Sequence, residues 1–92
     1  MAKIYVTQYA HQADVKVYKV DHAYQADLLV FPVDHGYQAT ADGLWYYVDQ
    51  SYQASTKIFF VDHAYQAELK VFFVDHASQA KWQKNHQLQH RL

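Results

Sequence analysis

The sequence predicts an all-β protein built from tandem repeats, and three observations support this prediction. A seven-residue unit that begins with Val-Asp and ends with Gln-Ala recurs six times, the first copy being degenerate. The step between copies is 13 residues, except for one step of 15 residues. Between the copies lie apolar segments of four to six residues, rich in β-branched and aromatic side chains, which are typical of strands.

We expect six strands, each followed by a turn, over residues 3–6, 15–20, 28–33, 44–48, 57–61 and 69–74. Successive residues of a strand point to opposite faces, so Leu69, Val71 and Phe73 share one apolar face, which is the predicted core face. The other face begins polar and ends apolar. Lys19 and Pro32 occupy the repeat position that Phe73 occupies in the last repeat. This column of equivalent residues is therefore predicted to be half exposed.

An antiparallel meander of six or seven strands that curls toward a barrel is the preferred arrangement, because the turns have a normal hairpin length and closure removes the sheet edges. The alternative is a parallel β-solenoid, in which equivalent residues would stack. The two extra residues of the long step lie in 40–43, where an Asp-Gly pair signals a turn. One domain is expected over 1–92, with the repeats at about 1–80 and a C-terminal cap or last strand at 81–92.

The repeated units resemble those of a family of small tandem-repeat proteins from bacteria and some insects, to which no activity is assigned. The unit Val-Asp-His-Ala-Tyr-Gln-Ala at 20–26 and 61–67, the opening at 2–7 and Trp82 after the last Gln-Ala carry the resemblance. It covers nearly the whole chain. It implies a repeat architecture and no particular chemistry.

Composition and the missing motifs exclude several function classes. The net charge of -1 offers no basic face for a nucleic acid backbone, so no nucleic acid partner is expected. The chain has no cysteine and no apolar run long enough for a signal peptide or a membrane span, so we expect a cytoplasmic protein without a membrane partner. It has no glycine-rich phosphate loop and no Gly-x-Ser-x-Gly motif, and a repeated array lacks the unique site that catalysis needs. We expect no enzyme and no cofactor.

Histidine forms one column of candidate functional residues. It follows Asp in four of the copies and could bind Zn²⁺, Cu²⁺ or Ni²⁺ if neighbouring repeats bring the imidazoles together. The competing interpretation is a turn in which Asp accepts backbone N–H groups and His is solvated. The residues concerned are His22, His35, His63 and His76.

Glutamine and tyrosine form two further columns. The Gln side chains are predicted to bind loop backbone groups, and they are Gln12, Gln25, Gln38, Gln53, Gln66 and Gln79. Tyrosine is amphipathic and common at binding surfaces, so its column is the candidate site for a carbohydrate or a protein partner. These residues are Tyr24, Tyr37, Tyr52 and Tyr65, unless they only cover the loop ends of the core.

Near-identical units without a unique reactive site favour a non-enzymatic binding or interaction module. Two alternatives remain open. The chain could be a structural protein that self-assembles into a homo-oligomer through sheet edges or its second apolar face. It could also bind metal through its histidines.

Overall fold

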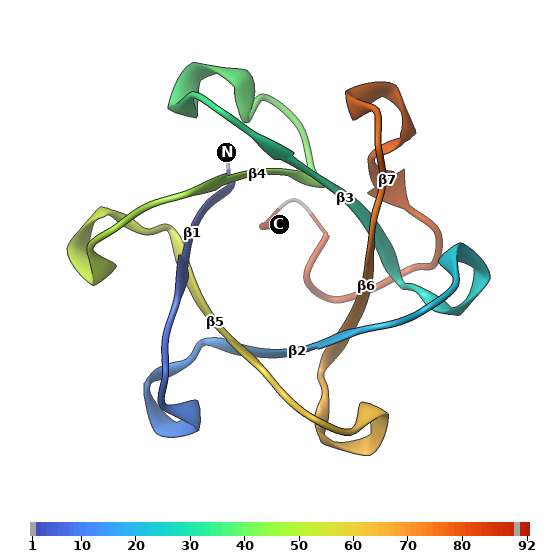
Figure 1. Ribbon diagram of the computed structural model, residues 1–92, viewed down its shortest axis with the longest axis horizontal. Helices are drawn as coiled ribbons and strands as arrows, with labels where there is room; N and C mark the ends of the chain where they lie inside the picture. The colour runs from blue at the N-terminus through green and yellow to red at the C-terminus, as the bar shows by residue number, and fades with distance from the viewer. Residues whose placement is uncertain (1, 90) are drawn as a thin grey trace.

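The computed structural model describes residues 2–89 and 91–92, so residues 1 and 90 of the predicted domain lie outside the described residues. Strands alternate with short 3-10 helices in a flattened molecule of 32 × 30 × 22 Å (Figure 1). The strands are β1 (Ala2–Val6), β2 (Val15–Lys19), β3 (Leu28–Val33), β4 (Leu44–Tyr47), β5 (Thr56–Phe60), β6 (Leu69–Phe73) and β7 (Lys81–Trp82). The 3-10 helices are η1 (Ala10–Gln12), η2 (Ala23–Gln25), η3 (Gly36–Gln38), η4 (Ser51–Gln53), η5 (Ala64–Gln66) and η6 (Ala77–Gln79). The six predicted strands are therefore confirmed to within one residue at each end.

Strands β1 to β6 form a closed barrel in which every pair is parallel, in the order β1-β5-β2-β6-β3-β4 and back to β1. The prediction of an all-β barrel is confirmed, but the antiparallel meander is wrong. Among these six strands, only β3 and β4 are neighbours both in sequence and in the barrel. The solenoid alternative was right about parallel strands, although successive repeats do not stack on one another. Only β7 is antiparallel, where it pairs with β3.

The chain passes around the barrel in two interlaced circuits (Figure 1). Strands β1, β2 and β3 occupy alternate places, and β4, β5 and β6 fill the gaps between them. Each connection skips one place, except the connection from β3 to β4, which moves to the adjacent place. This is the connection that contains the two extra residues. A third equal step would have returned the chain to the place of β1.

The barrel interior consists of layers of equivalent residues. At each strand pair the register shifts by two residues, so that Val17 pairs with Phe60 on one side and Leu69 on the other. This stagger tilts the strands steeply relative to the barrel axis. Residues at the same position of each repeat therefore lie at the same height along that axis. The middle layer is completely buried and comprises Ile4, Val17, Val30, Trp45, Ile58 and Val71. The predicted core face is thus confirmed.

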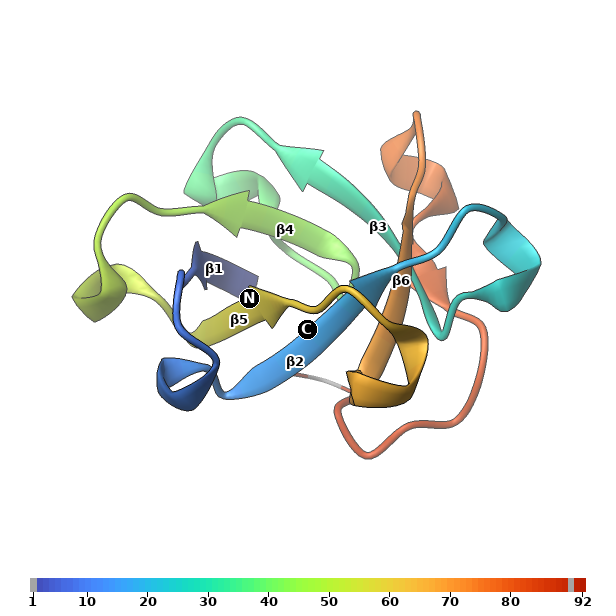
Figure 2. The same cartoon turned by 60° about the horizontal axis from the view of Figure 1, so that its bottom comes forward.

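The C-terminal tail covers the end of the barrel where the strands begin (Figure 2). Leu88 and Leu92 are buried in the main core cluster. The indole Nε1 of Trp45 donates a hydrogen bond of 2.8 Å to the carbonyl oxygen of Leu92, and Gly43 N donates one of 2.7 Å to the same oxygen. The tail therefore closes one end of the barrel and is anchored to its middle layer.

The six 3-10 helices form corners that project outward between the strands (Figure 1). At each corner two main-chain bonds close the turn, as in η2, where Gln25 N donates to the carbonyl of His22 at 3.0 Å and Ala26 N donates to that of Ala23 at 3.1 Å. The predicted acceptor role of the Asp side chain is not seen at the described corners. None of the helices described here is long and apolar enough to cross a membrane.

Candidate binding clefts

The four tyrosines of the predicted site lie at the tips of the corners. Their exposed fractions range from 75% to 83%, for Tyr24, Tyr37, Tyr52 and Tyr65. Three of these rings stack on the histidine two residues earlier, with centroid distances of 5.3 to 5.6 Å and interplanar angles of 5° to 13°. The four tyrosines therefore do not cover the core. Three of them form separate exposed ring pairs, and Tyr52 has Gln50 in place of the histidine.

The histidines of the predicted metal site are also held apart. His22, His35, His63 and His76 each precede the first residue of a different 3-10 helix, in extended backbone. Among the residues that the structure describes, no group of three or more His, Asp or Glu side chains is placed to hold a metal ion. The geometry brings no two members of this column together at one site.

Glutamine side chains bind loop groups at two of the corners. The Gln38 Oε1 atom accepts hydrogen bonds from the backbone N of Asp34 at 3.1 Å and of His35 at 3.0 Å. At the first corner Thr7 Oγ1 donates to Gln12 Oε1 at 3.1 Å. For Gln25, Gln53, Gln66 and Gln79 this role stays a prediction.

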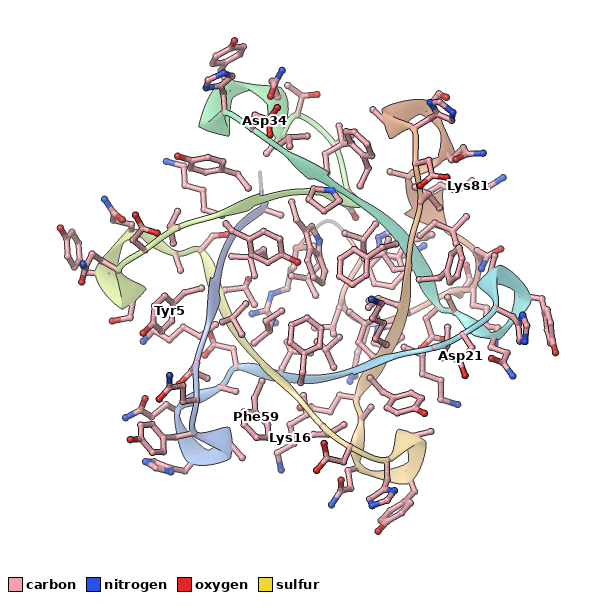
Figure 3. The ribbon with its side chains drawn as sticks, viewed as in Figure 1. Tyr5, Lys16, Asp21, Asp34, Phe59 and Lys81 are labelled. Atoms are coloured by element: carbon pink, nitrogen blue, oxygen red, sulfur yellow. The ribbon has the colours of Figure 1, made fainter. Side chains whose placement is uncertain are left out.

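Open clefts lie on the outer face of the barrel, between the corners. They include Gln25, Gln53 and Gln66 of the predicted glutamine column and Tyr52 of the tyrosine column, together with residues that were not predicted. The Phe59 cleft, of about 330 Å³, is lined by Phe59, Lys16, Asp62 and Gln66 together with Ala10 and Val61. Lys16 on β2 and Phe59 on β5 are direct cross-strand partners, and Figure 3 shows them side by side on the outer face. The corner that follows β5 supplies the carboxylate and the amide. The cleft therefore combines an ammonium, an aromatic ring, a carboxylate and an amide.

The same four groups recur in two further clefts of about 450 Å³ each. The Tyr46 cleft contains Lys3, Tyr46, Asp49 and Gln53, and the Tyr18 cleft contains Lys70, Tyr18, Asp21 and Gln25. In both, the lysine and the aromatic residue are again cross-strand partners. Because the register is the same around the barrel, one repeat places its aromatic ring beside the lysine of another repeat each time.

Two other positions in the barrel show variants of this arrangement. The Phe72 cleft, of about 630 Å³, has Leu29 in place of the lysine and adds Lys81 and Gln83 from the chain after η6. Tyr5 pairs with Lys57 in the normal way, but the degenerate first repeat has Gln8 where other copies have Asp. The full combination is therefore found in three clefts among the described residues.

The lysines and aromatic residues of these clefts were not predicted from the sequence. They lie on the second face of the strands, where an aromatic residue stands two before the Val of each Val-Asp and a lysine or leucine four before it. Their 13-residue recurrence was a visible signal. Their pairing was not, because Lys16 and Phe59 are 43 positions apart and meet only through the interlaced strand order.

A family model described as a 7(1) septoil knot domain matches residues 1–83. Comparison with curated proteins and with solved structures finds no match.

Proposed function

Since the chain belongs to the 7(1) septoil knot domain family, whose description names a topology and no activity, we propose a function from the geometry of the clefts. The protein is a non-enzymatic binding module, and its Phe59, Tyr46 and Tyr18 clefts bind an uncharged oligosaccharide. One observation carries this proposal: the same four chemical groups recur in all three clefts. A repeated set of equal sites suits a ligand that itself has repeating units or several copies.

The chemistry of each cleft matches a polyhydroxylated ligand. The aromatic ring offers a flat apolar face, and the amide and carboxylate offer hydrogen-bond acceptors beside amide and ammonium donors. The Phe59 and Tyr46 clefts each contain one lysine and one aspartate, so their formal charges cancel. The Tyr18 cleft has a second lysine, Lys84, but its ammonium lies 3.8 Å from a carboxylate oxygen of Asp27. Neither a cation nor an anion is therefore strongly favoured. A sugar ring presents C–H groups on its faces and hydroxyls around its edge, which is the complementary pattern.

The test is calorimetric titration of the full chain with cellotetraose, chitotetraose and maltotetraose. We expect at least one of them to bind saturably, with a dissociation constant that changes less than about twofold between 50 and 500 mM salt, because the ligand is neutral. The triple variant Asp21→Asn, Asp49→Asn and Asp62→Asn should weaken binding at least about tenfold, since each site exchanges a charged acceptor with two oxygens for a neutral amide with one. All three side chains are exposed, so the fold should be unaffected. Absence of binding by all three sugars at about 10 mM, which is enough to detect millimolar dissociation constants, would refute the proposal.

A matched control addresses the tyrosines at the corner tips. The triple variant Tyr24→Phe, Tyr37→Phe and Tyr65→Phe removes exposed hydroxyls outside the clefts and should leave sugar affinity unchanged. Loss of affinity in this variant, with the Asn variant unaffected, would move the site to the corners that the sequence predicted. Assembly through sheet edges and metal binding receive no support from the closed ring and the separated histidines, and both stay predictions, as does a bacterial or insect origin.

A further inference from the structure

The end of the barrel where the strands finish is open. One inward-facing residue from each strand forms a ring here, called the mouth, which consists of Val6, Lys19, Pro32, Tyr47, Phe60 and Phe73. Val6 is 40% exposed and Tyr47 is 36% exposed. Lys19 and Pro32 are exposed, and the two phenylalanines are half-buried, as the sequence predicted for this column. The tail covers the opposite end, so nothing in the described structure lies over the mouth.

Lys19 makes the mouth chemically unlike the rest of the barrel. Every other ring member is uncharged, and the layer beneath is wholly apolar. The ammonium of Lys19 lies 5.3 Å from the centroid of the Phe73 ring, so the lysine leans over the mouth. The single ion pair found among the described residues joins Lys84 and Asp27 elsewhere, so no described carboxylate is in ion-pair contact with Lys19.

Tyr47 supplies a second polar group on the opposite side of the mouth. In the strand order β4 and β2 are separated by β1 and β5 on one side and by β3 and β6 on the other, so Tyr47 faces Lys19 across the ring. Burial raises the pKa of the Tyr47 hydroxyl to about 12, so the group remains a neutral hydrogen-bond donor at physiological pH. Phe60 and Phe73 lie on the strands that flank Lys19.

We propose that the mouth binds a small aromatic monocarboxylate, with the carboxylate at the Lys19 ammonium and the aromatic ring over Phe60 and Phe73. Charge complementarity selects this occupant, because an apolar ring with one unpaired cation favours an apolar body that carries one negative charge. A second copy is a poorer occupant, since two mouths placed face to face would bring the two Lys19 cations together. The proposal does not depend on sugar binding by the outer clefts, although Tyr47 also lines the Tyr46 cleft and Phe73 the Phe72 cleft. Lys19, Pro32 and Phe60 belong to none of the four clefts described above.

Two tryptophans provide an internal comparison for the test. Trp45 lies directly below the mouth, with its ring centroid 6.4 Å from those of Tyr47 and Phe73. Trp82 is on β7, and its Nε1 donates to Asp42 Oδ2 at 2.7 Å. In an NMR titration with 4-ethylbenzoate, the indole ring C–H signals of Trp45, whose N–H is hydrogen-bonded to the tail at the other end, should shift saturably and those of Trp82 should not. A ligand of this size and a site this open suggest a dissociation constant of about 0.1–1 mM.

Charge is tested with variants of two lysines. Lys19→Met should weaken binding of 4-ethylbenzoate at least about tenfold, and Lys19→Arg should restore most of it. Lys57→Met removes the same charge from the outer face of β5, at a residue that belongs to none of the three proposed sugar clefts, and should leave the affinity unchanged. The neutral 4-ethylbenzamide should bind at least about tenfold more weakly than the acid.

Three outcomes would overturn the proposal. The first is an equal shift of the Trp45 and Trp82 signals on addition of 4-ethylbenzoate. The second is an affinity for 4-ethylbenzoate that Lys19→Met does not change. The third is the absence of any Trp45 shift in a protein that light scattering shows to be a stable dimer. In the third case the mouth is an interface between copies.

Discussion

The layered barrel predicts that one substitution has very different effects at two heights on the same inner face. Val71 lies in the middle layer and is fully buried, whereas Val6 lies at the mouth and is 40% exposed. Changing either residue to alanine removes the same two methyl groups from a strand. The difference between the two variants therefore reports mainly how deeply each side chain is buried.

The magnitude follows from what surrounds each side chain. Two buried methyl groups account for about 1.6 kcal/mol of lost transfer free energy, and the cavity left at Val71 raises the loss to about 2–3 kcal/mol. For a domain of this size, such a loss lowers the melting temperature by about 10–20 °C. Val6→Ala leaves no enclosed cavity and should lose less than about 1 kcal/mol.

The assay is equilibrium urea denaturation followed by tryptophan fluorescence. Each variant is measured from both the folded and the unfolded side, because a chain wound twice around a barrel can approach equilibrium slowly. A difference in the free energy of unfolding of at least about 1 kcal/mol between Val71→Ala and Val6→Ala is expected. Equal losses would refute the layer assignment, since they would mean that Val6 is as enclosed as Val71 and that something covers the mouth.

Two further predictions concern the backbone and pH. Gly43→Ala should destabilise the protein by about 2 kcal/mol or more, because Gly43 has a φ of +89° and an added Cβ would lie 2.7 Å from a backbone oxygen. Gly36→Ala should be neutral or slightly stabilising in the same melting assay, because the nearest atom would be 3.6 Å away and other repeats have alanine there. The pKa of Tyr47 is raised to about 12 by burial, so the unfolded state ionises first and stability should fall as the pH rises from about 10 to 12. Tyr47→Phe should lose less stability over that range, and an identical pH dependence in the two proteins would contradict the assignment.

The strand boundaries and the inward face could be predicted because they depend on local pattern. β-branched and aromatic residues define each strand, and the two-residue period assigns Leu69 and Val71 to the core. The half-exposed column could also be predicted, since Lys19 and Pro32 break an otherwise apolar position. These features require no knowledge of which strand lies beside which.

The strand order could not be predicted from local pattern, because it depends on how far each corner carries the chain. A short connection usually indicates a hairpin, and parallel neighbours usually need a crossover of a dozen or more residues. Here the strands are so steeply inclined that each runs largely around the barrel. Each strand therefore ends near the point where the strand two places further around the barrel begins. A short corner such as 20–27 is then long enough to connect two strands that run in the same direction. The outer clefts were missed for the same reason, since their lysine and aromatic residues belong to different circuits.

The interlaced circuits also explain why the barrel has a single core. In the middle layer, first-circuit residues alternate with second-circuit residues around the whole ring, and Ile58, for example, lies between Ile4 and Val17. Neither circuit has a continuous sheet or a closed interior without the other, because its strands occupy only alternate places. The matching family model is described as a knot, and in this chain two circuits interlace around one barrel. The one irregular step of 15 residues is therefore not a defect in the repeat, since it shifts the second circuit into the gaps left by the first.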